Sequence, residues 1–295
     1  MDYLLKLDKV SKIYDDKVVV RNVSFEIEKG KVYGLLGPNG AGKTTIMKII
    51  MNQVKCDRGS VLCDNNLKIK YLQDVPQFYE FYSVEEYLRF ILDICHYGKD
   101  KEIRINEVLD LLNLKEYKDI KIKLLSRGLR QKVGIASVII DEADVLILDE
   151  PISALDPIGR KEMFDVILSL KGKITIIFSS HIVNDVERVC DHVILINKGK
   201  IIFNQSITSQ VLEKKTLLVV FQNKDDLIRI KDKIEYECYY NSVIENCLEI
   251  EIDEIDRTQK VIFKMLLDNE IVVNSISLKK DSLEEIFLRE VSKNV

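Results

Sequence analysis

The residue types that could do chemistry are first concentrated in residues 34–45, which read GLLGPNGAGKTT. This segment holds four of the 12 glycines of the chain and ends on a lysine and two threonines. It fits the pattern G-x-x-x-x-G-K-[ST], in which glycines let the backbone curl until successive N–H groups face phosphate oxygens. An apolar run at 31–36 precedes it and a helical pattern at 46–51 follows it, so the loop lies at a strand-to-helix turn. The helix adds its positive end to the site.

This loop predicts a site for the phosphates of a nucleoside triphosphate. Lys43 is expected to reach the β- and γ-phosphates, and the Thr44 hydroxyl is expected to coordinate Mg²⁺. The alternative, a glycine-rich connection with a chance lysine, is disfavoured because every fixed position is filled and the flanking elements are correctly placed. The predicted nucleotide-binding residues of the loop are Gly37, Pro38, Asn39, Gly40, Ala41, Gly42, Lys43, Thr44 and Thr45.

A pair of carboxylates follows a second apolar run, VLILDE, at residues 145–150. Because the chain turns at the end of a strand, both acids can reach one site although neighbouring strand residues point to opposite faces. Asp149 is expected to hold Mg²⁺, directly or through water, and Glu150 to orient or deprotonate the attacking water. The alternative is a buried strand that ends in solvated acids; the upstream phosphate loop disfavours it.

The elements that must position these groups alternate between strands and helices. Strand-like runs separated by helical stretches predict an α/β domain with a largely parallel central sheet. Residues 84–138 keep apolar side chains at helical spacing and predict an inserted helical subdomain. After Gln205 the order becomes β-α-β-β-α-β, which predicts a small ferredoxin-like α+β domain, followed by a terminal helix at SLEEIFLREV. The expected domains are 1–210 and 211–295.

Composition limits the classes of function. Lys and Arg total 44 against 48 for Asp and Glu, so the net charge of −4 does not indicate a strongly basic nucleic-acid-binding protein. No apolar run approaches the ~18–20 residues that span a bilayer, and the N-terminus lacks a signal-peptide core. We therefore expect a cytoplasmic protein whose membrane role, if any, comes through a partner. The six cysteines form no C-x-x-C pair, so neither a disulfide framework nor a cysteine metal site is expected.

Two further segments lie beside these motifs: LSRGLRQK at 125–132 and SALD at 153–156. Along the chain the motifs follow the order GPNGAGKTT, LSRGLRQK, VLILDE and SALD. This ordered set resembles the ATPase subunits of ABC transporters over roughly residues 1–210. The resemblance implies a P-loop NTPase core of the ABC type with a helical subdomain, which binds and hydrolyses ATP with Mg²⁺. A P-loop kinase or GTPase would share only the first motif and a VLILDE-like strand.

The resemblance also assigns roles to residues outside the phosphate loop. Gln73 in YLQDVP would contact the metal and water, and His181 in FSSHIVNDVE would sense the γ-phosphate as a catalytic residue. Tyr14 in VSKIYDD would stack on adenine. The full set that the resemblance adds is Tyr14, Gln73, Ser126, Gly128, Asp156 and His181.

In that family the segment matching LSRGLRQK binds the γ-phosphate of ATP held by the opposing subunit. Ser126 and Gly128 occupy the matching positions, whereas Arg127 replaces the usual glycine and Leu129 the usual glutamine, which puts the details of that contact in doubt. Ser126 could equally be a helix N-cap, and the two roles are compatible. One phosphate loop and one such segment per chain imply a head-to-tail pair, either two identical chains or this chain with a related one.

The resemblance implies partners as well. The expected partners are a second ATP-binding subunit and multi-span membrane permease subunits, with the chain peripheral on the inner face of the cell membrane and no nucleic acid bound. The ending SLEEIFLRE resembles accessory domains of bacterial drug-, antibiotic- or polysaccharide-export ATPases, which favours export. Two alternatives stay open: a soluble ABC ATPase acting on ribosomes or nucleic acid, and a regulator that barely hydrolyses ATP. The sequence does not specify a cargo.

Overall fold

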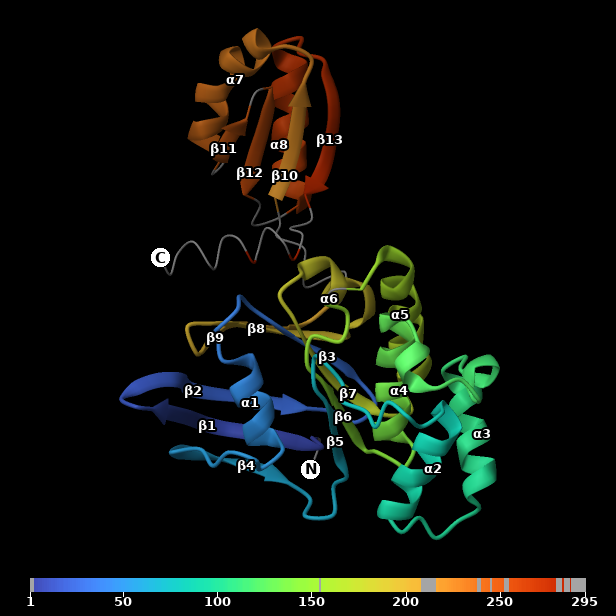
Figure 1. The fold of residues 1–295 in the computed structure, drawn as a ribbon. Coiled ribbons are helices and arrows are strands. Elements are labelled where there is room, and N and C mark those ends of the chain that lie inside the picture. The colour runs from blue at the N-terminus through green and yellow to red at the C-terminus, as the bar shows by residue number, and fades with distance from the viewer. Residues whose placement is uncertain are drawn as a thin grey trace. The chain divides into compact units, whose positions relative to one another are not determined.

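The computed structural model describes residues 3–153, 155–207, 216–237, 240–244, 246–251 and 255–279, together with 283 and 287. The chain divides into two compact units, Met1–Ile207 and Thr208–Val295 (Figure 1). The expected boundary at 210/211 stays a prediction.

The first unit contains two sheets. A three-stranded antiparallel sheet has the order β2-β1-β4, and a six-stranded sheet has the order β5-β6-β7-β3-β8-β9. In the larger sheet all neighbouring strands are parallel except β8 and β9, which form an antiparallel hairpin. The strands are β1 (Leu5–Tyr14), β2 (Lys17–Ile27), β3 (Val32–Leu36), β4 (Arg58–Cys63), β5 (Ile69–Leu72), β6 (Val145–Leu148), β7 (Thr175–Ser180), β8 (His192–Asn197) and β9 (Lys200–Ser206).

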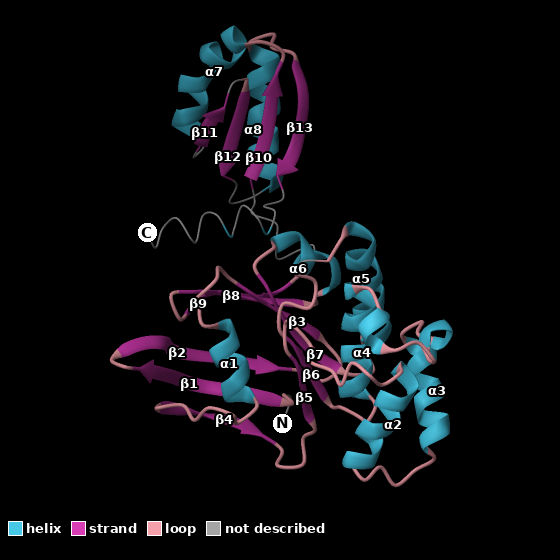
Figure 2. Cartoon of the chain, in the orientation of Figure 1, coloured by secondary structure: helices cyan, strands magenta, loops and turns pink. Residues whose placement is uncertain are grey.

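Helices connect these strands and pack on the sheets (Figure 2). They are α1 (Lys43–Ile50), α2 (Val84–Ile94), α3 (Lys101–Leu111), α4 (Arg127–Ile139), α5 (Pro157–Leu170) and α6 (Val183–Val189), with short 3-10 turns η1 (Lys115–Tyr117) and η2 (Ile122–Leu124). Side-chain hydrogen bonds cap the N-termini of several helices: Ser83 and Glu86 form a capping box on α2, and Asp100 caps α3. The predicted helical subdomain is confirmed as α2, α3 and α4.

The main core of this unit lies between its two sheets and contains α1. It takes buried aliphatic side chains from β1, β2, β3, β6, β7 and β8 and from the apolar face of α1, including Ile46 and Met47. The central strands β3, β6 and β7 are buried along their whole length, as expected for parallel strands covered on both faces. The core therefore fixes the strand ends that bear the candidate site.

The second unit is a four-stranded antiparallel sheet with two helices. Its sheet order is β11-β12-β10-β13. Its elements are β10 (Thr216–Phe221), α7 (Lys224–Glu237), β11 (Tyr240–Ile244), β12 (Cys247–Glu251), α8 (Ile255–Asp268) and β13 (Val273–Lys279). The β-α-β-β-α-β order confirms the ferredoxin-like prediction. A separate core includes Phe221, Ile230 and Ile262. The predicted terminal helix lies outside the described residues except for positions 283 and 287.

Two details differ from the sequence expectations. The run HVILINKGKIIF at 192–203 is the hairpin of β8 and β9 and not the single strand that its apolar pattern suggests, because Lys198 and Gly199 both take positive φ angles at its turn. The short strands β4 and β5 were not expected.

In the described part of the chain no helix is both long and apolar enough to cross a membrane.

Candidate functional site

The candidate site lies at one edge of the six-stranded sheet, where four parallel strands end in register. Leu36 pairs with Ser180, Leu148 with Phe178 and Leu72 with Leu148. Because the carboxyl ends of parallel strands meet at the same edge, the segments that start at residues 37, 73, 149 and 181 leave the sheet side by side. Each of these four positions is a predicted site residue: Gly37, Gln73, Asp149 and His181.

Glycine is required in the loop between β3 and α1. A Cβ on Gly37 would lie 2.2 Å from the Ile196 carbonyl oxygen, and Gly42 has a φ of 107° with the Val19 carbonyl 2.9 Å from its Cβ position. The Gly37 amide donates to the Ser180 carbonyl at 3.2 Å, which ties the loop to the end of β7. At positions 37 and 42 only glycine fits this path.

The Lys43 ammonium group is held inside the curl of the loop. It is 6 % exposed and donates to the Gly37 carbonyl at 2.7 Å and to the Pro38 carbonyl at 3.3 Å. Glu150 Oε1 lies 3.4 Å from Lys43 Nζ. A cationic group, the open amides of a loop and the start of α1 thus lie in one place, which is the chemistry that an anion such as a phosphate chain requires.

Three hydroxyl groups surround the Asp149 carboxylate, which is 8 % exposed. Its Oδ2 accepts from Thr44 Oγ1 at 3.1 Å and from the Tyr71 hydroxyl at 3.1 Å. Its Oδ1 accepts from Ser179 Oγ at 2.8 Å. Burial, followed by the nearby charge of Asp149, raises the pKa of Tyr71, so the phenol stays protonated and remains a donor at physiological pH.

Glu150 is held by both its backbone and its side chain. Its φ of 48° is left-handed, and its amide donates to Ser179 Oγ at 2.9 Å. Its Oε2 lies 2.9 Å from His181 Nδ1. The structure therefore brings the predicted catalytic pair, Glu150 and His181, into direct contact beside Lys43.

Lys43, Thr44, Asp149 and Glu150 line a common cavity of about 230 Å³, and His181 contacts it through Glu150. Its walls are the phosphate loop, the start of α1 and the two acids that follow β6. The lining residues are Val19, Asn39, Gly40, Ala41, Gly42, Lys43, Thr44, Thr45, Asp149 and Glu150.

The donor set of this cavity fits Mg²⁺. Magnesium prefers hard oxygen ligands and is commonly held by one or two protein oxygens together with phosphate oxygens and water. Thr44 Oγ1 of the phosphate loop and Asp149 Oδ2, which faces it, are two such oxygens and lie 3.1 Å apart. These two residues would hold the ion.

Gln73 and Asp74 lie in the loop that follows β5 and differ in their contacts. The Gln73 side chain is exposed and donates to the Val75 carbonyl at 2.8 Å. Asp74 Oδ1 instead accepts from Ser153 Oγ at 2.7 Å, and Ser153 lies three residues after Glu150. The structure therefore does not bring the Gln73 amide to Asp149, and it shows a role for Asp74 that the sequence did not indicate.

The segment LSRGLRQK begins α4, as the N-cap interpretation predicts. Ser126 Oγ accepts from the Leu129 amide at 3.3 Å. A Cβ on Gly128 would lie 3.8 Å from Gly159 Cα, so α4 and α5 approach closely here. Asp156 caps α5 by accepting from the Gly159 amide at 2.7 Å. These three predicted residues line a cavity of about 310 Å³ that contains no phosphate-loop residue.

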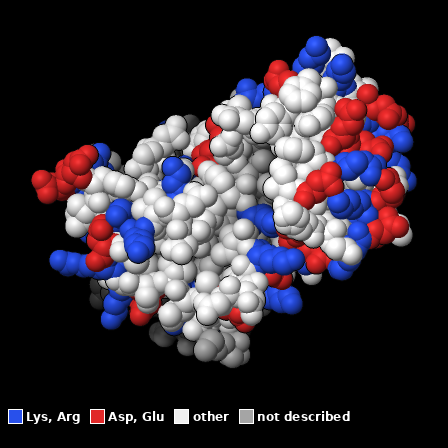
Figure 3. Space-filling view, turned by 60° about the horizontal axis from the view of Figure 1, so that its bottom comes forward, with Lys and Arg blue, Asp and Glu red and all other residues white. Residues whose placement is uncertain are grey.

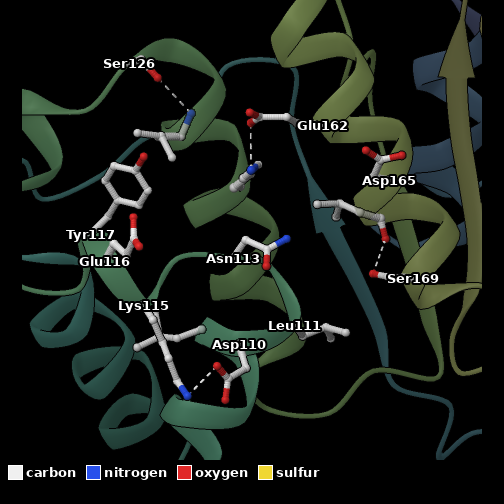
Figure 4. A pocket seen from close by; sticks show the side chains of 14 residues that line it. Asp110, Leu111, Asn113, Lys115, Glu116, Tyr117, Ser126, Glu162, Asp165 and Ser169 are labelled. Carbon is white, nitrogen blue, oxygen red and sulfur yellow. Dashed lines mark hydrogen bonds and ion pairs between the residues drawn. The ribbon is translucent and has the colours of Figure 1, made fainter.

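A larger cavity of about 650 Å³ shares Ser126, Leu129 and Glu162 with the previous one (Figure 4). Ion pairs join Lys132 to Glu162 and Lys115 to Asp110 in its lining. It contains no residue of the phosphate loop and neither acid after β6. The phosphate-loop cavity of about 230 Å³ is therefore the candidate nucleotide site.

Tyr14 lies at the end of β1 and is 41 % exposed. Lys12 Nζ lies 5.2 Å from the centre of its ring. Tyr14 does not line the phosphate-loop cavity, although Val19 from the next strand does. An exposed ring at this place is free to stack on a flat ligand, and its role stays a prediction.

Sequence reasoning missed Tyr71, Asp74 and Ser179. Each acts through a partner far along the chain: 78 residues separate Tyr71 from Asp149, and 30 separate Ser179 from it. Only the alignment of β5, β6 and β7 brings these groups together. No local spacing in the sequence could have identified them.

Comparison with known proteins gives consistent findings. Residues 20–153 match a family model described as ABC transporter. The chain is 33 % identical to the ABC transporter ATP-binding protein YcbN of Bacillus subtilis, covering 100 % of this chain and 99 % of that protein. It is 30 % identical to the bacitracin transport ATP-binding protein BcrA of Bacillus licheniformis, covering 98 % and 97 %.

Solved structures show the same likeness in the fold. One, an ATP-binding subunit of an ABC transporter, has a TM-score of 0.61 with 27 % identity and covers 69 % of this chain and 90 % of its own. A second, the ADP conformation of the ATP-binding cassette MJ1267, has a TM-score of 0.62 with 25 % identity over 69 % and 91 %. The P-loop NTPase fold expected from the sequence is therefore confirmed.

Proposed function

The chain belongs to the ATP-binding proteins of ABC transporters, a family that hydrolyses ATP, and on that premise we propose that its hydrolytic site is the cavity between the phosphate loop and β6. The single observation that carries this assignment is the direct contact of Glu150 with His181, beside the enclosed Lys43. A base, a residue that orients it and a phosphate-binding cation thus occupy one place.

Each residue has a distinct task in the proposed reaction. The loop amides and Lys43 bind the β- and γ-phosphates. Glu150 orients the attacking water and accepts its proton as the water oxygen bonds to the γ-phosphorus, while the bond from that phosphorus to the β–γ bridging oxygen breaks and ADP leaves. His181 holds the Glu150 carboxylate and contacts the γ-phosphate. Mg²⁺, when bound, neutralises the charge that develops on the phosphate oxygens. Thr44 and Asp149 hold it, and Gln73 stays a proposed metal contact of this loop.

We further propose that the working assembly is a head-to-tail pair with membrane permease subunits. Ser126 and Gly128 at the start of α4 would bind ATP held by the opposing subunit, Asp156 would lie at the same interface, and Tyr14 would stack on adenine. The separation of the Ser126 cavity from the phosphate-loop cavity supports this, because one chain does not bring the two together. The proposed domains are 1–210, with helices at 84–138, and 211–295.

Export is the transport direction that we propose, with the chain on the inner face of the membrane. The support is its similarity over nearly the full length to a protein named for bacitracin transport, and the second, ferredoxin-like unit. A role on ribosomes or nucleic acid is not favoured. Figure 3 shows acidic and basic residues interspersed at the right of the view. In the helical subdomain, Arg89 pairs with Glu85 and Glu102, so acids balance its positive charge.

The decisive test of the hydrolytic site is the Glu150→Gln variant. We expect it to bind ATP like the parent chain and to lose at least about 100-fold in turnover, because the amide cannot accept the proton. Exposed Glu116, which lies outside the cavity, gives the matched control Glu116→Gln, with unchanged turnover. Equal turnover of the parent and the Glu150→Gln variant would refute the assignment.

The partner proposal has its own test. The chain is purified from its own cells in mild detergent, and the proteins that accompany it from the membrane fraction are identified. A multi-span membrane protein is the expected result. Recovery with ribosomes or DNA from the soluble fraction would overturn the transport role while leaving the ATPase assignment intact.

A further inference from the structure

Of the three hydroxyl groups on Asp149, the one from Tyr71 belongs to no motif. Thr44 is part of the phosphate loop, and Ser179 lies two residues before His181. Tyr71 comes from β5, the edge strand of the six-stranded sheet, and its hydroxyl donates to the same oxygen, Oδ2, that accepts from Thr44. The carboxylate oxygen that faces the phosphate loop is thus oriented from two sides.

The phenol is well placed to be a permanent donor. Its ring packs against the main core of the unit, which leaves the hydroxyl little freedom to turn away. The hydroxyl lies 3.1 Å from Asp149 Oδ2, and because an ionised carboxylate oxygen can only accept, the phenol is the donor in this hydrogen bond.

The backbone of the same strand strengthens the connection. The Asp149 amide donates to the Leu72 carbonyl at 2.9 Å, so consecutive residues of β5 hold both the main chain and the side chain of Asp149. The Leu72 side chain in turn packs on α4, where its Cδ1 lies 2.9 Å from the position that a Cβ on Gly134 would take. The end of β5 therefore bridges the acid after β6 and the helix that begins with Ser126.

We propose that Tyr71 is a positioning residue for the metal site: its hydroxyl holds Asp149 Oδ2 toward Thr44. The inference deepens the proposed function and rests on its assignment of Asp149 as a residue that holds Mg²⁺. Tyr71 touches neither the nucleotide nor the ion and acts through the carboxylate. Partners of this kind, which orient a ligand of a metal, typically change metal affinity or activity by about 10–100-fold when they are removed.

The test is Tyr71→Phe in the full chain, which keeps the ring in the core and removes only the hydroxyl. Two readouts are taken while Mg²⁺ is titrated: ATP turnover, and the rise in melting temperature produced by ADP, which involves no hydrolysis. We expect the half-saturating Mg²⁺ concentration to rise about tenfold in both. The KM for ATP at saturating Mg²⁺ stays within twofold of the parent value.

Tyr33 provides the matched control. It is a buried tyrosine of β3 in the same six-stranded sheet, belongs to the same core and accepts a hydrogen bond from the Glu28 amide at 3.0 Å. Because Tyr33 is only 1 % exposed, Tyr33→Phe should cost at least as much folding stability. We expect it to leave the Mg²⁺ dependence unchanged.

A second measurement separates positioning from a general loosening of the core. Asp149→Asn and the double variant Asp149→Asn/Tyr71→Phe should have the same Mg²⁺ dependence, because Tyr71 then has no carboxylate to orient. The proposal is overturned if Tyr71→Phe leaves the Mg²⁺ dependence unchanged, if Tyr33→Phe shifts it equally, or if the effect of Tyr71→Phe persists in the Asp149→Asn background. A parent chain without Mg²⁺-dependent ATP turnover would instead refute the proposed function itself.

Discussion

At the scale of single residues, the unusual feature of the site is the left-handed backbone of Glu150. A φ of 48° costs a residue with a side chain roughly 1 kcal/mol or more, and such residues cluster where a side chain must be aimed. Here the compensation is visible. The Glu150 amide donates to Ser179 Oγ, and the same hydroxyl donates to Asp149. One buried hydroxyl thus fixes two consecutive acids.

We predict that Ser179→Ala lowers both stability and turnover. It removes the partner of the Glu150 amide and a donor to the Asp149 carboxylate, so the free energy of unfolding should fall by about 1–3 kcal/mol. Turnover should fall about tenfold, because both acids lose a support. Denaturant unfolding and steady-state ATP hydrolysis measure the two effects.

Ser24 offers a matched control for this prediction. Its hydroxyl accepts from the amide of Lys9, which also has a left-handed φ, of 51°, but it lies in the three-stranded sheet. Ser24→Ala should lower stability alone. Turnover of Ser179→Ala within twofold of the parent would contradict the proposed support.

At the scale of elements, the helix α4, which begins with the segment LSRGLRQK, and the strand β5 are in close contact at Gly134. A Cβ there would lie 2.9 Å from Leu72 Cδ1 and 2.9 Å from Pro76 Cγ. A glycine inside a helix ordinarily costs about 1 kcal/mol relative to alanine, so most substitutions would be expected to stabilise α4 by propensity alone. At this position packing opposes that gain.

Gly134→Val should therefore destabilise the chain by about 1–3 kcal/mol, because the added methyl groups push α4 away from β5. ATP turnover should fall with it, since β5 orients Asp149. Gly98, which has open space around its Cβ position, supplies the control Gly98→Ala, with little change in either quantity. A valine variant as stable as the parent in urea would show that the two elements are not in firm contact.

The sequence predicts the features that depend on local patterns and misses those that depend on which strands are neighbours. The helical insertion and the β-α-β-β-α-β order are local patterns, and the fold confirms them. The phosphate loop and the two acids are local patterns as well; they lie after β3 and β6, and their roles stay predictions. The strand β5 is only four residues long and three of its residues are partly buried, so it gives little periodic signal. Tyr71 and Ser179 were missed because their roles depend on which strands are neighbours, and the sheet order β5-β6-β7 follows from no single segment.

At the scale of the whole molecule, the two units have separate cores. The core around α1 contains residues of the first unit only, and the core around Phe221 contains residues of the second only. All residues that line the phosphate-loop cavity come from the first unit. We therefore expect nucleotide binding to raise the free energy of unfolding of the first unit and not that of the second.

This separation predicts where a nucleotide protects the chain from hydrogen exchange. A ligand that binds only the folded form adds RT ln(1 + [L]/Kd), about 2.7 kcal/mol at 100 times Kd. With ADP and Mg²⁺ at that excess, the slowest amides of α1 and β6 should gain this protection, while those of β10 keep their rates. Lys43→Ala should abolish the gain, because it removes the cation held in the loop. Equal gains in α1 and β10 would mean that the units unfold as one, and no gain in α1 would remove the cavity as the nucleotide site.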